Sequence, residues 1–101
     1  MHKPFEYSFE WDPAKAWSNY KKHGITFERA ATVFNDPRAL TIFDESHSND
    51  EDRWVTLGTD SNMTFVVVSH LYRQQNDRTA WIRIISARKA TKKEIKQYQE
   101  I

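Results

Sequence analysis

The sequence predicts an α+β domain built from one strand, two helices, a four-stranded antiparallel meander and a C-terminal helix. Three observations predict this class. Apolar and polar residues alternate near the N-terminus, two segments bounded by helix-capping residues follow, and four strand-like runs then succeed one another over short polar turns. Short turns join antiparallel neighbours, and helices that precede the strands rather than alternate with them argue against a parallel α/β fold.

The chain has the size of one domain, and we expect a single unit over residues 1–101. Of its 101 residues, 39% are apolar, which is enough to build one core. With two glycines and three prolines, the sequence contains no segment that has the composition of a linker. The chain contains no cysteine, no run of the roughly 18 apolar residues that a membrane span needs, and no signal-peptide stretch near its start. We therefore expect a cytoplasmic protein without membrane contact.

The N-terminal strand is expected over residues 5–11, because aromatic side chains occupy every second position there. The first helix should begin at Asp12, whose carboxylate can cap free amides, with Pro13 in its first turn. It should end at Gly24, since glycine accepts a left-handed conformation and the cationic end Lys21-Lys22-His23 suits a helix C-terminus. The alternating aromatic residues are Phe5, Tyr7, Phe9 and Trp11.

The second helix is expected to start after the capping residue Thr26 and to end at Asn35-Asp36-Pro37. Four of its residues fall at i, i+3, i+4 and i+7 and make one apolar stripe. They are Phe27, Ala30, Ala31 and Phe34.

Four strand-like runs should pair in chain order, with an acidic segment as the first, long loop. A capping box of Thr91 and Glu94 then predicts a short C-terminal helix that carries Ile95 and Tyr98. The four runs are Ala39–Phe43, Arg53–Gly58, Met63–Tyr72 and Thr79–Arg88.

The net charge of +1 conceals two segments of opposite sign. Five of the fourteen acidic residues lie within residues 44–52, so the rest of the chain carries fifteen basic minus nine acidic residues, or +6. The last 24 residues hold seven basic and two acidic residues, or +5. Such a segment suits a phosphate backbone or an acidic protein partner, and composition does not choose between them.

No metal or cofactor site is expected. The four histidines, His2, His23, His47 and His70, show no close metal-ligand spacing, and the acidic segment lacks the alternating ligands and glycine of a calcium loop. A glycine-rich phosphate loop and a nucleophile elbow are also absent from the sequence.

Polar side chains on otherwise apolar strands are the first candidates for chemistry, because a buried charge without a partner is costly. His70 and Tyr72 share one apolar face of their run. Alternation places Arg83 on one face of the next run and both Ser86 and Arg88 on the other, so arginines are expected on both faces of the sheet. The structural alternative is that Arg83 is an exposed cation and His70 a hydrogen-bonded strand-end residue.

Two further clusters leave the same choice open. The pair Lys22-His23 is either a favourable set of cations at a helix end or part of a site. The sequence Glu51-Asp52-Arg53 lies where a loop enters a strand, and it is either a surface ion-pair cluster or a source of a catalytic base.

Many ordered pieces of the sequence together resemble the BrnT toxin family, and the likeness covers nearly the whole chain. The pieces of the first half are Phe9-Glu10-Trp11-Asp12, Lys15, Asn19, Lys22-His23-Gly24, Phe27-Glu28-Ala30 and Val33-Phe34-Asp36-Pro37. Those of the second half are Asp44, His47, Glu51-Asp52-Arg53-Trp54, Leu57-Gly58, Val66-Val67-Val68, His70 and the segment from Arg83 to Ala90.

The resemblance implies a fold similar to that of RelE-type ribonucleases and a cytoplasmic enzyme that cuts RNA and halts translation. It also implies a BrnA-type antitoxin that binds the toxin, in an assembly of two toxins and two antitoxins. That complex would repress the shared operon, and operator DNA would be contacted only through the antitoxin.

RNA cleavage without metal needs a base for the 2′-hydroxyl, cations for the phosphorane and an acid for the 5′-oxygen. We assign Arg83 and Arg88 to the phosphate as a hypothesis. The candidate bases are His70 and Glu51, and the candidate acids are His23 and Tyr72. Further RNA contacts are expected from Lys22, Arg53, Ser86 and Lys89.

Three tryptophans, Trp11, Trp54 and Trp81, could stack on unpaired bases, with core packing as the alternative for at least two of them. Two other functions stay open. The chain could be a non-catalytic module that binds nucleic acid or an antitoxin in operon repression, or a degenerate toxin that has kept only its antitoxin contacts.

Overall fold

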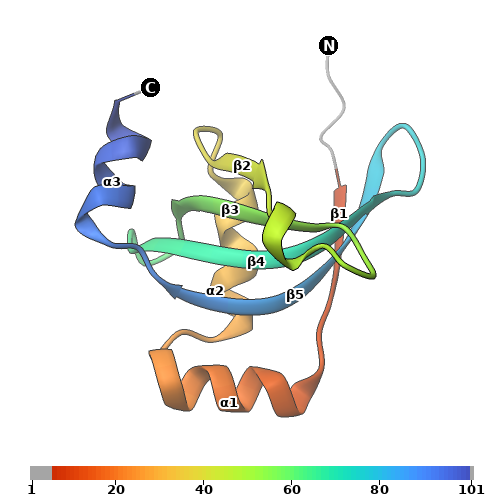
Figure 1. Ribbon diagram of the computed structural model, residues 1–101, viewed down its shortest axis with the longest axis horizontal. Coiled ribbons are helices and arrows are strands. Elements are labelled where there is room, and N and C mark those ends of the chain that lie inside the picture. The colour runs from red at the N-terminus through yellow and green to blue at the C-terminus, as the bar shows by residue number, and fades with distance from the viewer. Residues whose placement is uncertain (1–5, 101) are drawn as a thin grey trace.

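The computed structural model describes residues 6–100 as one sheet with helices against both of its faces (Figure 1). The sheet has five strands in the order β1-β5-β4-β3-β2. The strands are β1 (Glu6–Glu10), β2 (Leu40–Phe43), β3 (Arg53–Thr59), β4 (Phe65–Gln74) and β5 (Thr79–Lys89). The α-helices are α1 (Pro13–His23), α2 (Phe27–Thr32) and α3 (Lys92–Gln99), and 3-10 turns cover Val33–Asn35 and Glu45–His47.

The predicted α+β class and the antiparallel meander are confirmed. Strands β2 to β5 pair antiparallel in chain order. The N-terminal strand β1 joins the same sheet in parallel with β5, so the sheet is mixed. The chain leaves β1 through two helices and returns in β2 at the opposite edge of the sheet, and the antiparallel meander then brings β5 beside β1. Phe5, the expected first residue of this strand, lies outside the described residues.

The helix ends follow the capping residues. The Asp12 carboxylate accepts from the Ala14 amide at 2.8 Å, and α1 ends at Gly24 with a φ of 71°. Thr26 accepts from the Arg29 amide at 3.1 Å at the start of α2. Helix α2 ends at Thr32, earlier than its apolar stripe predicted. The reason is that its last turn tightens into the 3-10 turn at Val33–Asn35 before Pro37.

The main core lies between α2, the end of α1 and one face of the sheet. Its buried residues come from the α1–α2 region and from strands β4 and β5. They are Ile25, Phe27, Ala30, Val33, Val66, Val68, Ile82, Ile84 and Ala87. We call this the helical face of the sheet.

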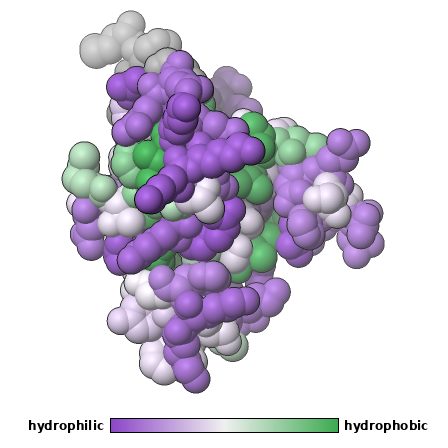
Figure 2. All heavy atoms as spheres, turned by 60° about the vertical axis from the view of Figure 1, so that its left-hand side comes forward, coloured by the Kyte–Doolittle hydropathy of each residue, from purple (hydrophilic) through white to green (hydrophobic). Residues whose placement is uncertain are grey.

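Of the helices within residues 6–100, α3 packs on the opposite face, at one end, and we call this face the open face. Tyr98 packs there beside Leu57 and Val67, and its hydroxyl donates to Asp36 at 2.7 Å. The predicted capping box of Thr91 and Glu94 is present. Seen from the α3 side, hydrophilic side chains cover most of the surface, with hydrophobic groups between them (Figure 2).

A β-bulge in β5 corrects the expected distribution of the arginines. Ser69 pairs with Ser86, but the next residue, His70, pairs with Ile84, so Ile85 is an extra residue in β5. The extra residue resets the alternation of side chains. Arg83, Ser86 and Arg88 therefore all lie on the open face, and the prediction of arginines on both faces is wrong.

Strand β4 begins two residues later than predicted because the turn before it continues through Met63, which has a φ of 61°. The Asp60 carboxylate holds this turn by accepting from the amides of Asn62 and Thr64 at 2.8 and 3.0 Å. Within residues 6–100, no helix is long and apolar enough to cross a bilayer.

Candidate active site

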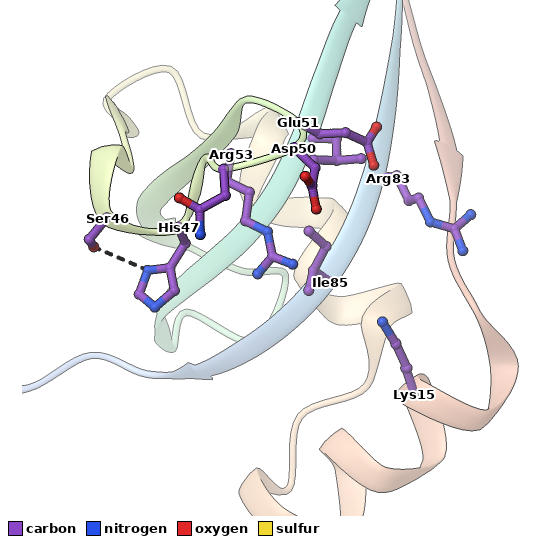
Figure 3. A pocket seen from close by; sticks show the side chains of 10 residues that line it. Lys15, Ser46, His47, Asp50, Glu51, Arg53, Arg83 and Ile85 are labelled. Carbon is purple, nitrogen blue, oxygen red and sulfur yellow. Dashed lines mark hydrogen bonds between the residues drawn. The ribbon is translucent and has the colours of Figure 1, made fainter.

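A polar hollow of about 350 Å³ opens on the open face, between the acidic loop, the bulged part of β5 and the start of α1 (Figure 3). We call it the cationic hollow, because three cations from different elements line it. Arg53 comes from the start of β3, Arg83 from β5 and Lys15 from α1. Its other lining residues are Ser46, His47, Asn49, Asp50, Glu51, Leu71 and Ile85.

The bulge and the pairing of β3 with β4 bring Arg53 and Arg83 to the same side. Both residues pair with Leu71, one from each neighbouring strand, so their side chains flank it on the open face. Figure 3 shows the Arg53 guanidinium reaching inward and Lys15 rising from α1 on the far side. Asp50 and Glu51 project from the loop above, so cations and carboxylates share one hollow.

Arg83 is held at the edge of the hollow by Glu10 of β1. The Glu10 carboxylate accepts from the Arg83 guanidinium and from the Trp81 indole nitrogen, the latter at 3.0 Å. The hydrogen bond from Trp81 and the positive charge of Arg83 lower the pKa of Glu10. The guanidinium of Arg73 lies over the Trp81 ring, 5.3 Å from its centre. Arg83 thus belongs to an ordered cluster rather than being a free surface cation.

The acidic loop that closes the hollow is organised by its own hydrogen bonds. The Asp44 carboxylate and the His47 imidazole nitrogen Nδ1 lie 2.9 Å apart. This hydrogen bond is the main cause of the lowered pKa of Asp44. Ser48 donates to the Asp44 carbonyl at 2.6 Å and accepts from the Arg53 amide at 2.9 Å. These hydrogen bonds hold the loop in one conformation, which places His47 and Glu51 at the hollow.

The structure brings three of the predicted site residues together and places the others elsewhere. Glu51, Arg53 and Arg83 line the cationic hollow. Arg88 lies further along the same face, where it forms two hydrogen bonds of 2.8 and 2.9 Å with Glu94 of α3. This pairing lowers the pKa of Glu94 to about 2 and raises that of Arg88.

The remaining predicted RNA contacts do not line this hollow. Ser86 is half-buried on the open face next to the bulge. Lys89 is exposed at the end of β5, and its pairing with Val66 turns it to the helical face. Lys22 and His23 occupy the C-terminal turn of α1.

His70 lies on the helical face, away from the arginines, and is 1% exposed. Its Nδ1 is 3.1 Å from the Leu71 carbonyl oxygen, and its Nε2 is 2.8 Å from the Thr56 hydroxyl. Burial lowers its pKa to about 4. The ring also packs edge-on against Phe34 at 4.8 Å. Both nitrogens are therefore already engaged, and the side chain is neutral at pH 7.

His70 and Tyr72 line a second hollow of about 300 Å³ on the helical face. Trp54 also lines it, whereas Trp11 packs edge-on against Phe27 in the core. The structure thus places the three tryptophans in three settings, with Trp81 bound to Glu10 on the open face.

Lys15 and His47 are the lining residues that were not singled out by their local pattern. Lys15 is one exposed cation in a helix, and His47 stands in a loop where periodicity has no meaning. Both occur among the residues that carry the family resemblance, and this is the signal that could have found them. In residues 6–100 no group of three or more His, Asp or Glu side chains is arranged to hold a metal ion.

Comparisons with known proteins agree with the sequence resemblance. The family model of the ribonuclease toxin BrnT of type II toxin–antitoxin systems matches residues 11–94. The fold is similar to the crystal structure of the Brucella abortus ribonuclease toxin BrnT, with a TM-score of 0.60 and 20% identity. That match covers 81% of this chain and 94% of the Brucella chain. None of the curated proteins compared with the chain matches it.

Proposed function

We infer that this chain, which belongs to the BrnT family of ribonuclease toxins of type II toxin–antitoxin systems, cuts RNA in the cationic hollow without a metal ion. One observation carries the assignment to this hollow. Three cations, a histidine and two carboxylates from three separate parts of the chain converge there. A metal-independent ribonuclease needs this combination of cations, a base and an acid.

Arg53 and Arg83 are the phosphate ligands in this proposal, with Lys15 adding charge from the opposite wall. Guanidinium groups bind phosphate oxygens in pairs of hydrogen bonds, and they stabilise the extra negative charge of the phosphorane. Glu10 and Trp81 fix the position of Arg83 before RNA arrives. Arg88, which was assigned with Arg83 to the phosphate, has a secondary role, because Glu94 already takes both of its terminal nitrogens.

Proton transfer is assigned to the loop side of the hollow. Glu51 would take the proton from the 2′-hydroxyl, and the oxygen formed would attack the neighbouring phosphorus. His47, held by Asp44, would give a proton to the departing 5′-oxygen. The products are a 2′,3′-cyclic phosphate and a 5′-hydroxyl. His70 takes no proton in this scheme because its nitrogens are engaged on the other face, and His23 and Tyr72 do not line the hollow.

A BrnA-type antitoxin would neutralise the toxin by covering the cationic hollow with an acidic segment. The arrangement of two toxins with two antitoxins, and operator binding through the antitoxin alone, are the expectations that come with the family. The charge of the hollow supports direct blockage, because the cations that would bind phosphate would equally bind carboxylates.

The test is incubation of the purified chain with naked RNA in excess EDTA, followed by chemical mapping of the new ends. We expect cyclic phosphate and 5′-hydroxyl ends, and no cleavage once the antitoxin is added. Arg83→Ala, Arg53→Ala, Glu51→Gln and His47→Ala should each slow cleavage by about 100-fold or more. Lys93→Ala, which removes an exposed cation of α3, is the matched control and should cut at the original rate.

The outcomes separate the alternatives. Cleavage that stops in EDTA and returns with Mg²⁺ would contradict metal independence. RNA binding without product, on naked RNA and on ribosomes alike, would instead support a non-catalytic module. Full activity of the Arg53 and Arg83 variants would move the site away from the cationic hollow.

A further inference from the structure

The second hollow, on the helical face, is lined largely by aromatic rings. Its volume of about 300 Å³ lies at the lower end of the range for small-molecule sites, about 300–1,000 Å³. Four of its lining residues carry aromatic rings, and Ile82 forms part of its floor. The aromatic residues are Tyr7, Phe34, Trp54 and Tyr72. We call this hollow the aromatic pocket.

Hydrogen bonds link His70, Thr56 and Thr41 in a row, and they decide whether one wall of the pocket offers a donor or an acceptor. The Leu71 carbonyl can only accept, so Nδ1 of His70 carries the hydrogen. The Nε2 of the neutral ring is then an acceptor, and the Thr56 hydroxyl must donate to it at 2.8 Å. Since Thr56 has only one hydrogen, the contact of 2.8 Å between the two threonine hydroxyls is a hydrogen bond donated by Thr41.

Thr41 is the exposed end of this chain and lines the pocket. Its single hydrogen points to Thr56, so its oxygen offers only lone pairs to a ligand. The aromatic pocket therefore combines flat stacking surfaces with a fixed hydrogen-bond acceptor. This combination suits a planar ligand that carries an N–H donor on its edge.

The aromatic pocket is connected to the cationic hollow by shared lining residues. A small groove at the end of β4 is lined by Glu51 and Leu71, which also line the cationic hollow. The same groove is lined by Tyr72, which lines the aromatic pocket. A strand of RNA held in the cationic hollow can thus continue along this groove, past Tyr72, to the aromatic pocket.

We propose that the aromatic pocket binds one unstacked base of the RNA strand whose phosphate lies in the cationic hollow, and that Thr41 accepts a hydrogen bond from an N–H group on the edge of that base. Every RNA base carries such a donor, as an exocyclic amino group in adenine, cytosine and guanine and as N3–H in uracil, whereas 3-methyluracil has none. Aromatic side chains are the usual platforms for unpaired bases. The inference rests on the proposed function, because it needs RNA in the cationic hollow.

The test measures binding, so it does not depend on cleavage. Uncleavable 2′-O-methyl oligomers of 3-methyluridine, with or without one uridine or cytidine, are titrated into the purified chain, and fluorescence anisotropy gives the Kd. One hydrogen bond predicts a preference of about fivefold for the oligonucleotides that carry the base with an N–H donor. Thr41→Val should abolish the preference, whereas Thr41→Ser, which keeps the hydroxyl, should retain it.

Loss of stacking is tested separately. Tyr72→Ala should weaken binding of these oligonucleotides by about fivefold or more, and should not change binding of an oligomer of equal length whose residues are all abasic. Trp17→Ala is the matched control, because Trp17 is a 62% exposed aromatic residue of α1 that lines neither hollow.

Each outcome has a distinct meaning. An equal Kd for oligonucleotides with and without the base that carries an N–H donor, or a preference that survives Thr41→Val, would overturn the proposal even if the chain cuts RNA. Selective binding that depends on Thr41, without any cleavage, would support the pocket and contradict the proposed function. If Thr41→Val fails to fold, the Tyr72→Ala comparison decides the question, since Tyr72 is 41% exposed. Unchanged binding by Tyr72→Ala would then reject the pocket.

Discussion

At the scale of single residues, His70 makes stability depend on pH. Its pKa is about 4 in the folded chain and 6.5 when the ring is solvated, so between these values the unfolded chain binds a proton that the folded chain does not. Stability must therefore fall as the pH drops from 6.5 to 4, by up to about 3 kcal/mol. Urea unfolding at pH 7, 6, 5 and 4 measures this fall.

The variant His70→Gln isolates the contribution. It should be less stable than the natural chain at pH 7, and the difference should shrink as the pH approaches 4. Carboxylates such as Glu94, whose lowered pKa acts at more acidic pH, are present in both proteins and cancel in the comparison. A difference that stays constant with pH would mean that the buried ring is not kept neutral by the fold.

At the scale of elements, one side chain joins α1 to β5. Strand β1 pairs with β5 only as far as Arg83, and beyond that point Asn19 takes the place of a neighbouring strand. Its side chain donates to the Ala87 carbonyl at 2.9 Å and accepts from the Ala87 amide at 3.0 Å. Asn19→Ala would leave both buried groups unpaired, so we expect a loss of about 2–4 kcal/mol in urea unfolding.

The neighbouring change Ser18→Ala is the control for this junction. Ser18 is exposed on α1, and its replacement should alter stability by less than about 0.5 kcal/mol. Equal effects of the two changes would show that α1 is held by helix propensity rather than by the contact between Asn19 and Ala87.

At the scale of the whole molecule, the sheet separates charge from aromatic surface. The cationic hollow lies on the open face and the aromatic pocket on the helical face. We therefore expect the attraction between the protein and the RNA phosphates to come mainly from the few cations of the cationic hollow. The slope of log Kd against log salt should decrease by about 1.4 in the double variant Arg53→Ala/Arg83→Ala, about 0.7 for each lost contact with single-stranded RNA.

The matched comparison removes two cations elsewhere. Lys93→Ala/Lys96→Ala changes the net charge equally but takes both charges from α3. Its slope should equal that of the natural chain. An equal decrease in both double variants would indicate that RNA responds to the overall charge rather than to the cationic hollow.

The sequence by itself determined the elements. Asp12, Gly24, Thr26 and the capping box at Thr91 predict where helices begin or end, because capping is a contact between residues a few positions apart. Alternation and polar turns likewise predict the four strands of the meander. The family resemblance added the expectation of a ribonuclease toxin.

Only the tertiary structure decided which side chains meet. The bulge at Ile85 depends on the register between β4 and β5, and it moves Arg83 to the face of Arg88 without any sign in the periodicity. The cationic hollow is equally non-local, because its walls come from a loop, three strands and a helix. His70 shows the same limit, since its burial depends on Phe34 and Thr56, which lie far from it in the chain. Local patterns report the contacts of near neighbours, whereas a site is made by pairing and packing between distant segments.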